Sequence, residues 1–424
     1  MIRFYNGKLM SMDCGTHISS DEVWVDGGKI AYVGPPKEYD GKFEREINLN
    51  GNLVMPGFKN AHTHSPMTFL RSYADDVPLD KWLFEKIFPM EARLDANCVY
   101  EFTKLAILEY LTSGITASFD MYYEPEAYAQ ANIEMGFRTV LCGAVNDFKE
   151  SVPRLEAYYN KFNNYHPLIS YKLGFHAEYT TNLENLKAIA ELSQSLKAGV
   201  YTHNSETKSE VEGCIERYGK TPTELFDSIG MFEYGGGGFH NVYMTKKDLE
   251  IFRDKNVYAV TNPGSNSKLA SGIAPIDKMI EMGINVAIGT DGPASNNALD
   301  MFREMYLVTA LQKLANNDAA ACPAEEVLEM AAFTGAKAMG LDDCDCIAVG
   351  KQADLIVIDL NRPNMQPINN IAKNIVYSGS KENVKLTMIA GKILYENGEF
   401  FVGEKANDIY TRVNALTEEI KNRK

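Results

Sequence analysis

The hydrophobic and polar positions of this chain follow two patterns, one near its ends and one in its middle. Near both ends, short runs of alternating apolar and polar residues are separated by Gly-Gly, Asp-Gly and Gly-Pro pairs, which is typical of strands joined by hairpin turns. These runs occupy residues 2–5, 22–25, 29–33, 353–359, 384–390 and 392–395. Since chain ends often lie close in space, we predict that both ends together build one small β-sandwich domain.

The middle of the chain alternates short apolar or β-branched runs with helical stretches. One expected strand runs into residues 60–64, and seven more follow at 115–121, 138–145, 169–175, 200–203, 238–242, 257–261 and 285–290. Helices are expected at 94–112, 182–198 and 245–255, and residues 221–224 have the form of a capping box.

Eight strands that alternate with helices predict an α/β fold, a closed parallel (β/α)8 TIM barrel. An open, doubly wound sheet is the alternative that this pattern leaves. We place the first part of the small β domain at residues 1–56 and the barrel at 57–345. The second part of the β domain, with a terminal helix, then falls at 346–424.

Five of the seven histidines fall at the ends of expected strands or inside one. They are His62 and His64 on the first strand, His176 after the fourth, His203 on the fifth and His240 in the sixth, and Asp291 follows the eighth. Active sites of such barrels lie at the carboxyl ends of the strands. We therefore expect these side chains to form one site.

Three of these imidazoles and the carboxylate suit a divalent cation. His62 and His64 are two residues apart, so both side chains leave a strand on the same face. Together with His203 and Asp291 they match the ligands of Zn²⁺, with water at an open position. Such a cation lowers the pKa of its water from near 16 to roughly 7, so that hydroxide becomes available for hydrolysis.

Three side chains are candidates for proton transfer beside this cation. Glu206 lies three residues after His203, where it can shuttle a proton to a substrate. His240 is a candidate base for the attacking water. Asp291 can collect a proton and pass it to the leaving group.

Composition narrows the classes of partner and the expected compartment. The 424 residues include 42 basic and 57 acidic side chains, a net charge of −15, which disfavours nucleic acids and anionic membranes as partners. No signal peptide and no apolar run of membrane-spanning length is recognisable, so we expect a cytoplasmic protein. The seven cysteines lack Cys-x-x-Cys spacing, which argues against disulfides.

Several motifs resemble the amidohydrolase superfamily, specifically its branch of 5-methylthioadenosine/S-adenosylhomocysteine deaminases. The matching segments are residues 62–68, 70–71, 74–79, 82–83, 89–91, 203 with 206–207, 272–275 and 289–297. The resemblance implies a deaminase that releases ammonia from the purine ring of an adenosine derivative such as 5′-methylthioadenosine or S-adenosylhomocysteine. It also implies one Zn²⁺ per subunit, or Fe²⁺, and a homo-oligomer.

By this resemblance, individual residues receive roles. Glu206 protonates a ring nitrogen, while His240 and Asp291 activate the water and deliver protons to the departing ammonia. Glu91 and His176 match positions that contact the ribose or the substrate edge, and Trp82 lines the pocket beside the thioether tail. The segment 65–90, rich in aromatic residues, is expected to close over the pocket as a lid.

Departures from the branch leave the substrate open. Relatives that accept S-adenosylhomocysteine often carry an arginine where this chain has residues 141–144, so Arg154 is our candidate for a compensating charge. An aminohydrolase or chlorohydrolase acting on guanine, cytosine, a pterin or a triazine would use the same ligands. A metal-binding scaffold without activity would be expected to lack some of the six core residues, all of which are present.

Overall fold

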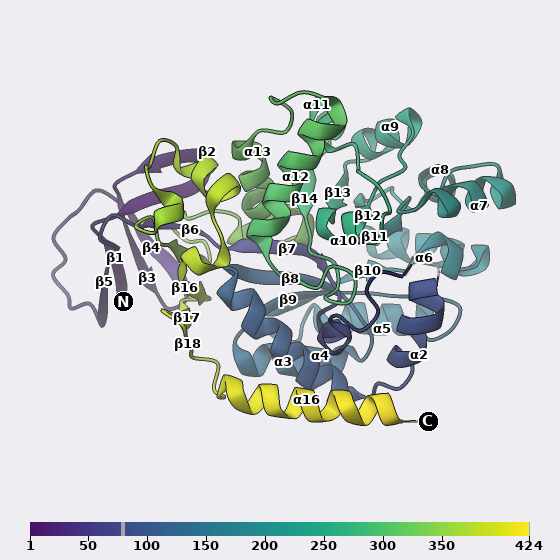
Figure 1. Cartoon of the computed structure of the whole chain (residues 1–424), viewed down its shortest axis with the longest axis horizontal. Helices are drawn as coiled ribbons and strands as arrows, with labels where there is room; N and C mark the ends of the chain where they lie inside the picture. The colour runs from purple at the N-terminus through teal and green to yellow at the C-terminus, as the bar shows by residue number, and fades with distance from the viewer. Residues whose placement is uncertain (78–80, 424) are drawn as a thin grey trace.

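The fold combines one parallel barrel with two smaller sheets at its side (Figure 1). The computed structural model describes residues 1–77 and 81–423. Eight parallel strands in chain order form the barrel, and helices connect them. The predicted TIM barrel is therefore confirmed, and the alternative of an open doubly wound sheet is wrong.

Neighbouring strands in the barrel are also neighbours in the sequence. They are β7 (Phe58–Thr63), β8 (Ile115–Met121), β9 (Arg138–Cys142), β10 (Ile169–Gly174), β11 (Val200–Asn204), β12 (Gly236–His240), β13 (Val257–Thr261) and β14 (Val286–Ile288). The helices between and after them are α3 (Ala96–Thr112), α4 (Pro125–Met135), α5 (Val152–Phe162), α6 (Leu183–Leu196), α7 (Lys208–Tyr218), α8 (Pro222–Ser228), α9 (Lys246–Asp254), α10 (Pro263–Lys268), α11 (Ile276–Glu281), α12 (Met301–Asn316), α13 (Ala324–Glu329) and α14 (Gly335–Met339). The predicted capping box is present, since Thr221 and Glu224 bond each other's backbone N–H groups.

The barrel closes where the segment after β14 returns to β7. The backbone N–H of Asp291 donates to the carbonyl oxygen of His62 (3.0 Å), and the backbone N–H of Thr290 donates to Asn60 Oδ1 (2.8 Å). A Cβ at Gly289 would lie 2.6 Å from the backbone nitrogen of His62, so only glycine allows this approach. Closure thus places Asp291 directly beside the first histidine.

Several strand boundaries differ from the sequence prediction; for example, the third barrel strand ends at Cys142 and not at residue 145. The apolar run 53–58 is divided next to the boundary that we placed between residues 56 and 57: β6 (Leu53–Pro56) pairs with β15 (Leu355–Ile358) in another sheet, while β7 belongs to the barrel. The sixth barrel strand begins at Gly236, before the predicted residue 238, since a run of glycines carries no apolar pattern. A Cβ at Gly236 would lie 2.0 Å from the carbonyl oxygen of Val200 on β11.

Both chain ends contribute to the two smaller sheets. The six-stranded sheet has the order β18-β17-β16-β15-β6-β2, and the four-stranded sheet has the order β4-β3-β1-β5. Their further bounds are β1 (Ile2–Tyr5), β2 (Lys8–Ser19), β3 (Glu22–Asp26), β4 (Lys29–Gly34), β5 (Arg45–Asn48), β16 (Val384–Ile389), β17 (Lys392–Glu396) and β18 (Glu399–Phe400). Phe4 and Val23 of one sheet share a buried apolar cluster with Val54, Leu355 and Leu386 of the other. This packing is the predicted sandwich.

The last helix, α16 (Ala406–Asn422), leaves the sandwich and packs along α3 of the barrel (Figure 1). Its side chains Ile409, Val413 and Ile420 are buried. The Nε of Arg412 lies 3.0 Å from Oε2 of Glu101 on α3. The end of the chain is therefore anchored on the barrel.

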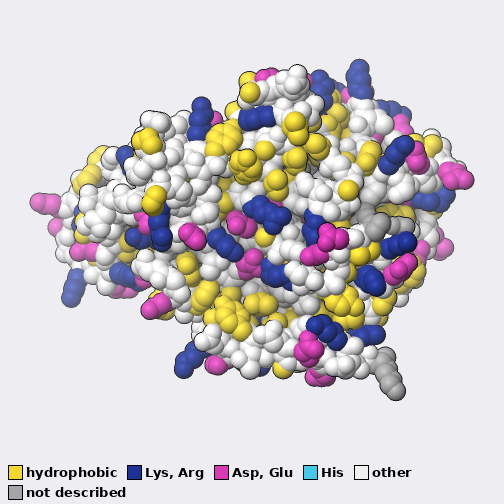
Figure 2. Space-filling view, in the orientation of Figure 1, with side chains coloured by type: hydrophobic (Ala, Val, Ile, Leu, Met, Phe, Trp, Pro, Cys, Tyr) yellow, Lys and Arg dark blue, Asp and Glu magenta, His cyan; other side chains and the backbone are white. Residues whose placement is uncertain are grey.

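The surface mixes charges of both signs, as Figure 2 shows for one face, where dark-blue and magenta side chains are interspersed over barrel and sandwich. In residues 1–77 and 81–423, no helix has the length and apolar character needed to cross a bilayer.

Candidate metal centre and proton-transfer site

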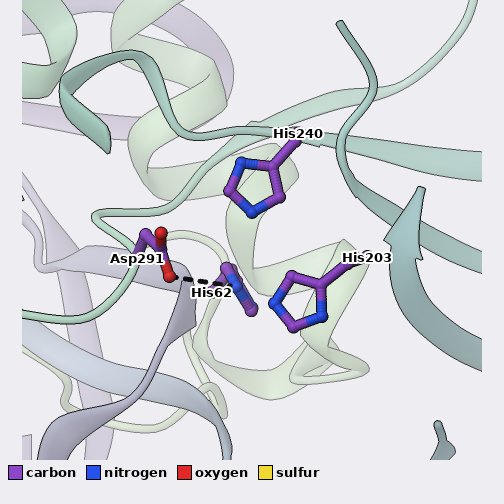
Figure 3. Close-up of side chains that lie close together, drawn as sticks. All are labelled: His62, His203, His240 and Asp291. Carbon is purple, nitrogen blue, oxygen red and sulfur yellow. Dashed lines mark ion pairs between the residues drawn. The ribbon is translucent and has the colours of Figure 1, made fainter. Parts of the chain in front are cut away.

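A cluster of imidazoles and one carboxylate lies at the carboxyl ends of the barrel strands (Figure 3). One ligand atom from each of His62, His203, His240 and Asp291 lies within 4.8 Å of those of the other three. His64 also belongs here, because its Nε2 lies 3.3 Å from His203 Nε2 and 3.3 Å from Asp291 Oδ1. The structure therefore brings together all four predicted metal ligands, with His240 beside them.

Backbone carbonyls fix the orientation of two of these rings. The Nδ1–H of His64 donates to the carbonyl oxygen of Met121 (2.7 Å), and that of His203 donates to the carbonyl oxygen of His176 (2.6 Å). With hydrogen on Nδ1, each ring turns the lone pair of Nε2 toward the cluster. This is the arrangement in which imidazoles bind a metal.

His62 provides the test of whether the cluster fits a cation. Its side chain is fully buried and stacks on Phe239, with 3.8 Å between ring centroids. Burial lowers its pKa to about 3, so the ring is neutral. Neither ring nitrogen has a hydrogen-bond partner among the described residues, which is costly for a buried polar group. A divalent cation at the cluster would satisfy the lone pair of Nε2.

Asp291 is held as an anion with one oxygen free for the cluster. Its Oδ2 accepts hydrogen bonds from Ser265 Oγ (2.6 Å) and Ser295 Oγ (2.7 Å), while Oδ1 lies 3.5 Å from His62 Nε2. Burial alone would raise the pKa of Asp291, but the facing imidazoles hold it well below its usual range. The carboxylate in turn raises the pKa of His64 to about 9 against the effect of burial, so a cation that binds here displaces a proton.

Glu206 and His240 lie next to the cluster. Glu206 is buried on the loop after β11, where Ser271 Oγ donates to its Oε1 (3.3 Å), and its Oε2 lies 3.8 Å from His240 Nε2. Burial raises the pKa of Glu206. Asn266 Oδ1 accepts the Nδ1–H of His240 (2.7 Å), which leaves Nε2 as the proton acceptor. The two groups can thus hold a proton and accept one within the same cavity.

Residues 53–394 match the amidohydrolase family. The chain belongs to the amidohydrolase family. It is 40% identical over 402 residues to the 5-methylthioadenosine/S-adenosylhomocysteine deaminase of Caldanaerobacter subterraneus subsp. tengcongensis, covering 93% of each chain. It is 39% identical over 390 residues to the protein of that name from Thermoanaerobacter pseudethanolicus, covering 90% of each.

A solved amidohydrolase-like structure superposes over the whole chain. An adenosine deaminase from Xanthomonas campestris with bound zinc has a TM-score of 0.95 and 31% identity, covering 100% of this chain and 99% of that one. The family membership predicted from the motifs is confirmed.

A cavity opens onto the cluster, and we call it the site cavity. Three of the four substrate contacts predicted outside the cluster line it. Trp82, Glu91 and His176 lie along its wall with Glu206 and Asp291. Trp82 and Glu91 reach it on a π-helical segment (Trp82–Ile87) and on α2 (Phe88–Glu91). Part of the predicted lid, residues 78–80, lies outside the described residues, and these include Pro78 and Leu79 of the matching motif.

Arg154 is not brought to this cavity. It lies on α5 with an exposed guanidinium, whose Nε is 3.8 Å from Glu150 Oε2 and whose Nη2 donates to the hydroxyl of Tyr158 (3.1 Å). We predicted a binding role for Arg154 as a replacement for the arginine that is absent from residues 141–144, but its position on α5 leaves the side chain exposed and outside this cavity.

Sequence reasoning missed the residues that orient the site. Asn266, Ser265 and Ser295 bond His240 and Asp291, and Glu210 accepts the backbone N–H groups of Ser205 (3.0 Å) and Glu206 (2.8 Å). The Thr207-x-x-Glu210 capping box was the signal in the sequence for Glu210, since it places a carboxylate under the Glu206 loop. Ser295 lies in the matching segment 289–297, which gave it no role of its own.

We expect Asn266→Ala to lower kcat by roughly 10- to 100-fold, because loss of an orienting partner allows His240 to change tautomer. Metal content should stay at the wild-type level. Steady-state rates and metal analysis test this, with Asn160→Ala on the exposed face of α5 as the control. Asn266→Asp keeps an acceptor and should recover part of the rate; a rate for Asn266→Ala within twofold of wild type would contradict the role.

Proposed function

We propose that this protein is a zinc-dependent aminohydrolase that releases ammonia from the purine ring of an adenosine derivative such as 5′-methylthioadenosine or S-adenosylhomocysteine. The observation that carries the proposal is the pair Glu206 and His240, a buried acid and an oriented base beside the cluster. The names of the relatives support the substrate class. Bound zinc in the Xanthomonas deaminase supports the metal, and the same His and Asp ligands also suit Fe²⁺.

When bound, the cation would supply a Lewis acid that makes a water molecule easier to deprotonate. His62, His64, His203 and Asp291 would hold it. His240 accepts the proton of the attacking water at Nε2, so that the water oxygen forms a bond to the ring carbon that bears the amine.

Proton donation completes the reaction. Glu206 gives its proton to the adjacent ring nitrogen as the carbon is attacked, and its raised pKa keeps that proton bound to higher pH than on an exposed glutamate. His240 then passes the proton it took from the water to the amine, Asp291 Oδ1 collects the remaining hydroxyl proton as the carbonyl forms, the carbon–nitrogen bond breaks, and ammonia leaves. The proton on Asp291 returns to Glu206 before the next turnover. The ring keeps a carbonyl oxygen in place of the amine.

Unpaired polar atoms in the site cavity support a hydroxyl-bearing substrate. Glu91 Oε1 and the hydroxyl of Tyr122 are buried at its wall without a hydrogen-bond partner among the described residues. Ribose hydroxyls can donate to such a carboxylate. His176 lies nearby, and burial lowers its pKa to about 4, so it offers a neutral ring.

Ammonia release by the zinc-loaded protein tests the proposal against adenosine, 5′-methylthioadenosine, S-adenosylhomocysteine, guanine, cytosine and a pterin. We expect turnover of at least one adenosine derivative, with kcat/KM in the ordinary enzyme range of about 10⁴–10⁸ M⁻¹s⁻¹. Metal-free protein is the control. Turnover of another ring alone would keep the aminohydrolase chemistry and reject the adenosine substrate. If no compound in the panel releases ammonia, the proposal is rejected.

A further inference from the structure

A second cavity of about 590 Å³ opens beside the site cavity. The two share Phe88, Glu91, Tyr123 and His176 in their walls, so a ligand seated on the cluster can extend from one into the other. Much of the second cavity is aromatic, and its phenyl groups include Phe148, which is 77% exposed. A space of this size is large for a methylthio group alone.

Lys149 is the positively charged residue among the described residues that line this cavity. Its ammonium lies 4.1 Å from the ring centroid of Tyr123, a cation–π contact. It has no ion-pair partner within 4.0 Å in the described part of the chain, whereas Arg154, five residues later, faces Glu150. Lys149 is therefore the basic group available to a ligand.

The loop that carries Lys149 is anchored at the cavity wall. Asn146 is 4% exposed, and its Oδ1 accepts the backbone N–H groups of Phe148 and Lys149, both at 2.9 Å. Its Nδ2 donates to the hydroxyl of Tyr123 (3.1 Å). Asn146 therefore bonds both the backbone of Lys149 and the ring of Tyr123 that lies under the ammonium. These bonds keep the positive charge at one side of the cavity.

We propose that the second cavity takes the 5′ substituent of the nucleoside and that Lys149 selects substituents that end in a carboxylate. This inference rests on the proposed function, because it requires the purine at the cluster and the ribose at Glu91 and His176. From there the substituent leads into the aromatic cavity. A methylthio group leaves the ammonium without a partner, while a homocysteine-type substituent brings a carboxylate toward it.

The test is the ratio of kcat/KM for S-adenosylhomocysteine to kcat/KM for 5′-methylthioadenosine. In Lys149→Met we expect this ratio to fall roughly fivefold or more, as befits a partly exposed charge pair. Lys149→Arg should keep most of the ratio. Lys161→Met, on an exposed lysine of α5 paired with Glu126, is the matched control. In wild type the ratio should also fall at high salt, and Lys149→Met should have lost that dependence.

Other outcomes separate the two proposals. A wild-type ratio that Lys149→Met leaves unchanged, with both nucleosides still deaminated, overturns the role of Lys149 alone. The same holds if Arg154→Met lowers the ratio instead. A wild-type enzyme that deaminates neither nucleoside overturns the proposed function and this inference together.

Discussion

Removal of the metal with a chelator is expected to lower ammonia release by at least about 10³-fold, because Lewis-acid activation contributes several kcal/mol to the barrier and each 1.36 kcal/mol is tenfold. The thermal midpoint should fall as well, since a cation bound only by the folded chain stabilises it. His62 explains the second effect: without a cation, its buried nitrogens have no hydrogen-bond partner among the described residues.

Metal analysis, thermal unfolding and the ammonia assay on the same samples check this expectation. Return of Zn²⁺ should restore both activity and midpoint. His203→Ala should lose metal and rate together, while His17→Ala, on an exposed histidine of β2, should lose neither. Protein that is metal-free by analysis yet fully active would refute the metal-dependent mechanism.

Glu206→Gln is expected to lower kcat/KM by roughly 10²- to 10⁴-fold, the usual contribution of a general acid or base. The amide keeps the size of the side chain but cannot give a proton to the ring nitrogen. Metal content should not change, because Glu206 lies beside the cluster and is not one of the proposed ligands. Glu212→Gln, on the exposed side of α7, is the control and should match wild type.

The pH dependence of activity is a second test of the role of Glu206 as proton donor. Burial raises its pKa, so the protonated acid persists to higher pH than for an exposed glutamate, and activity should decline as pH rises through that pKa. In Glu206→Gln this decline should vanish from the residual rate. A variant within tenfold of wild type, with the same profile, would exclude Glu206 as the proton donor.

The meeting of the four proposed metal ligands could be predicted because their positions follow from chain order. Each histidine or aspartate comes at the end of a strand, and a parallel barrel brings all such ends to one rim. His62, His64, His203 and Asp291 therefore meet as expected.

The orienting residues could not be predicted in the same way. Asn266 and Ser265 lie on α10, where polar residues are ordinary, and only the folded loop aims them at His240 and Asp291. The partner of β6 was also hidden, because a hydrophobic pattern does not tell which strand another strand pairs with. The close approach of Gly57 to β8 likewise appears only in space, where a Cβ at Gly57 would lie 2.1 Å from Thr116 Cγ2.

The six-stranded sheet also bears on how the chain is made. β6 is synthesised before the barrel, and its antiparallel partner β15 leaves the ribosome only after the entire barrel. Until then one edge of β6 is exposed, although β7, which directly follows it, already belongs to the active-site barrel. Nascent chains that stop short of β15 therefore carry an open strand edge, a template for aggregation, so quality control by chaperones matters most in the last stage of translation.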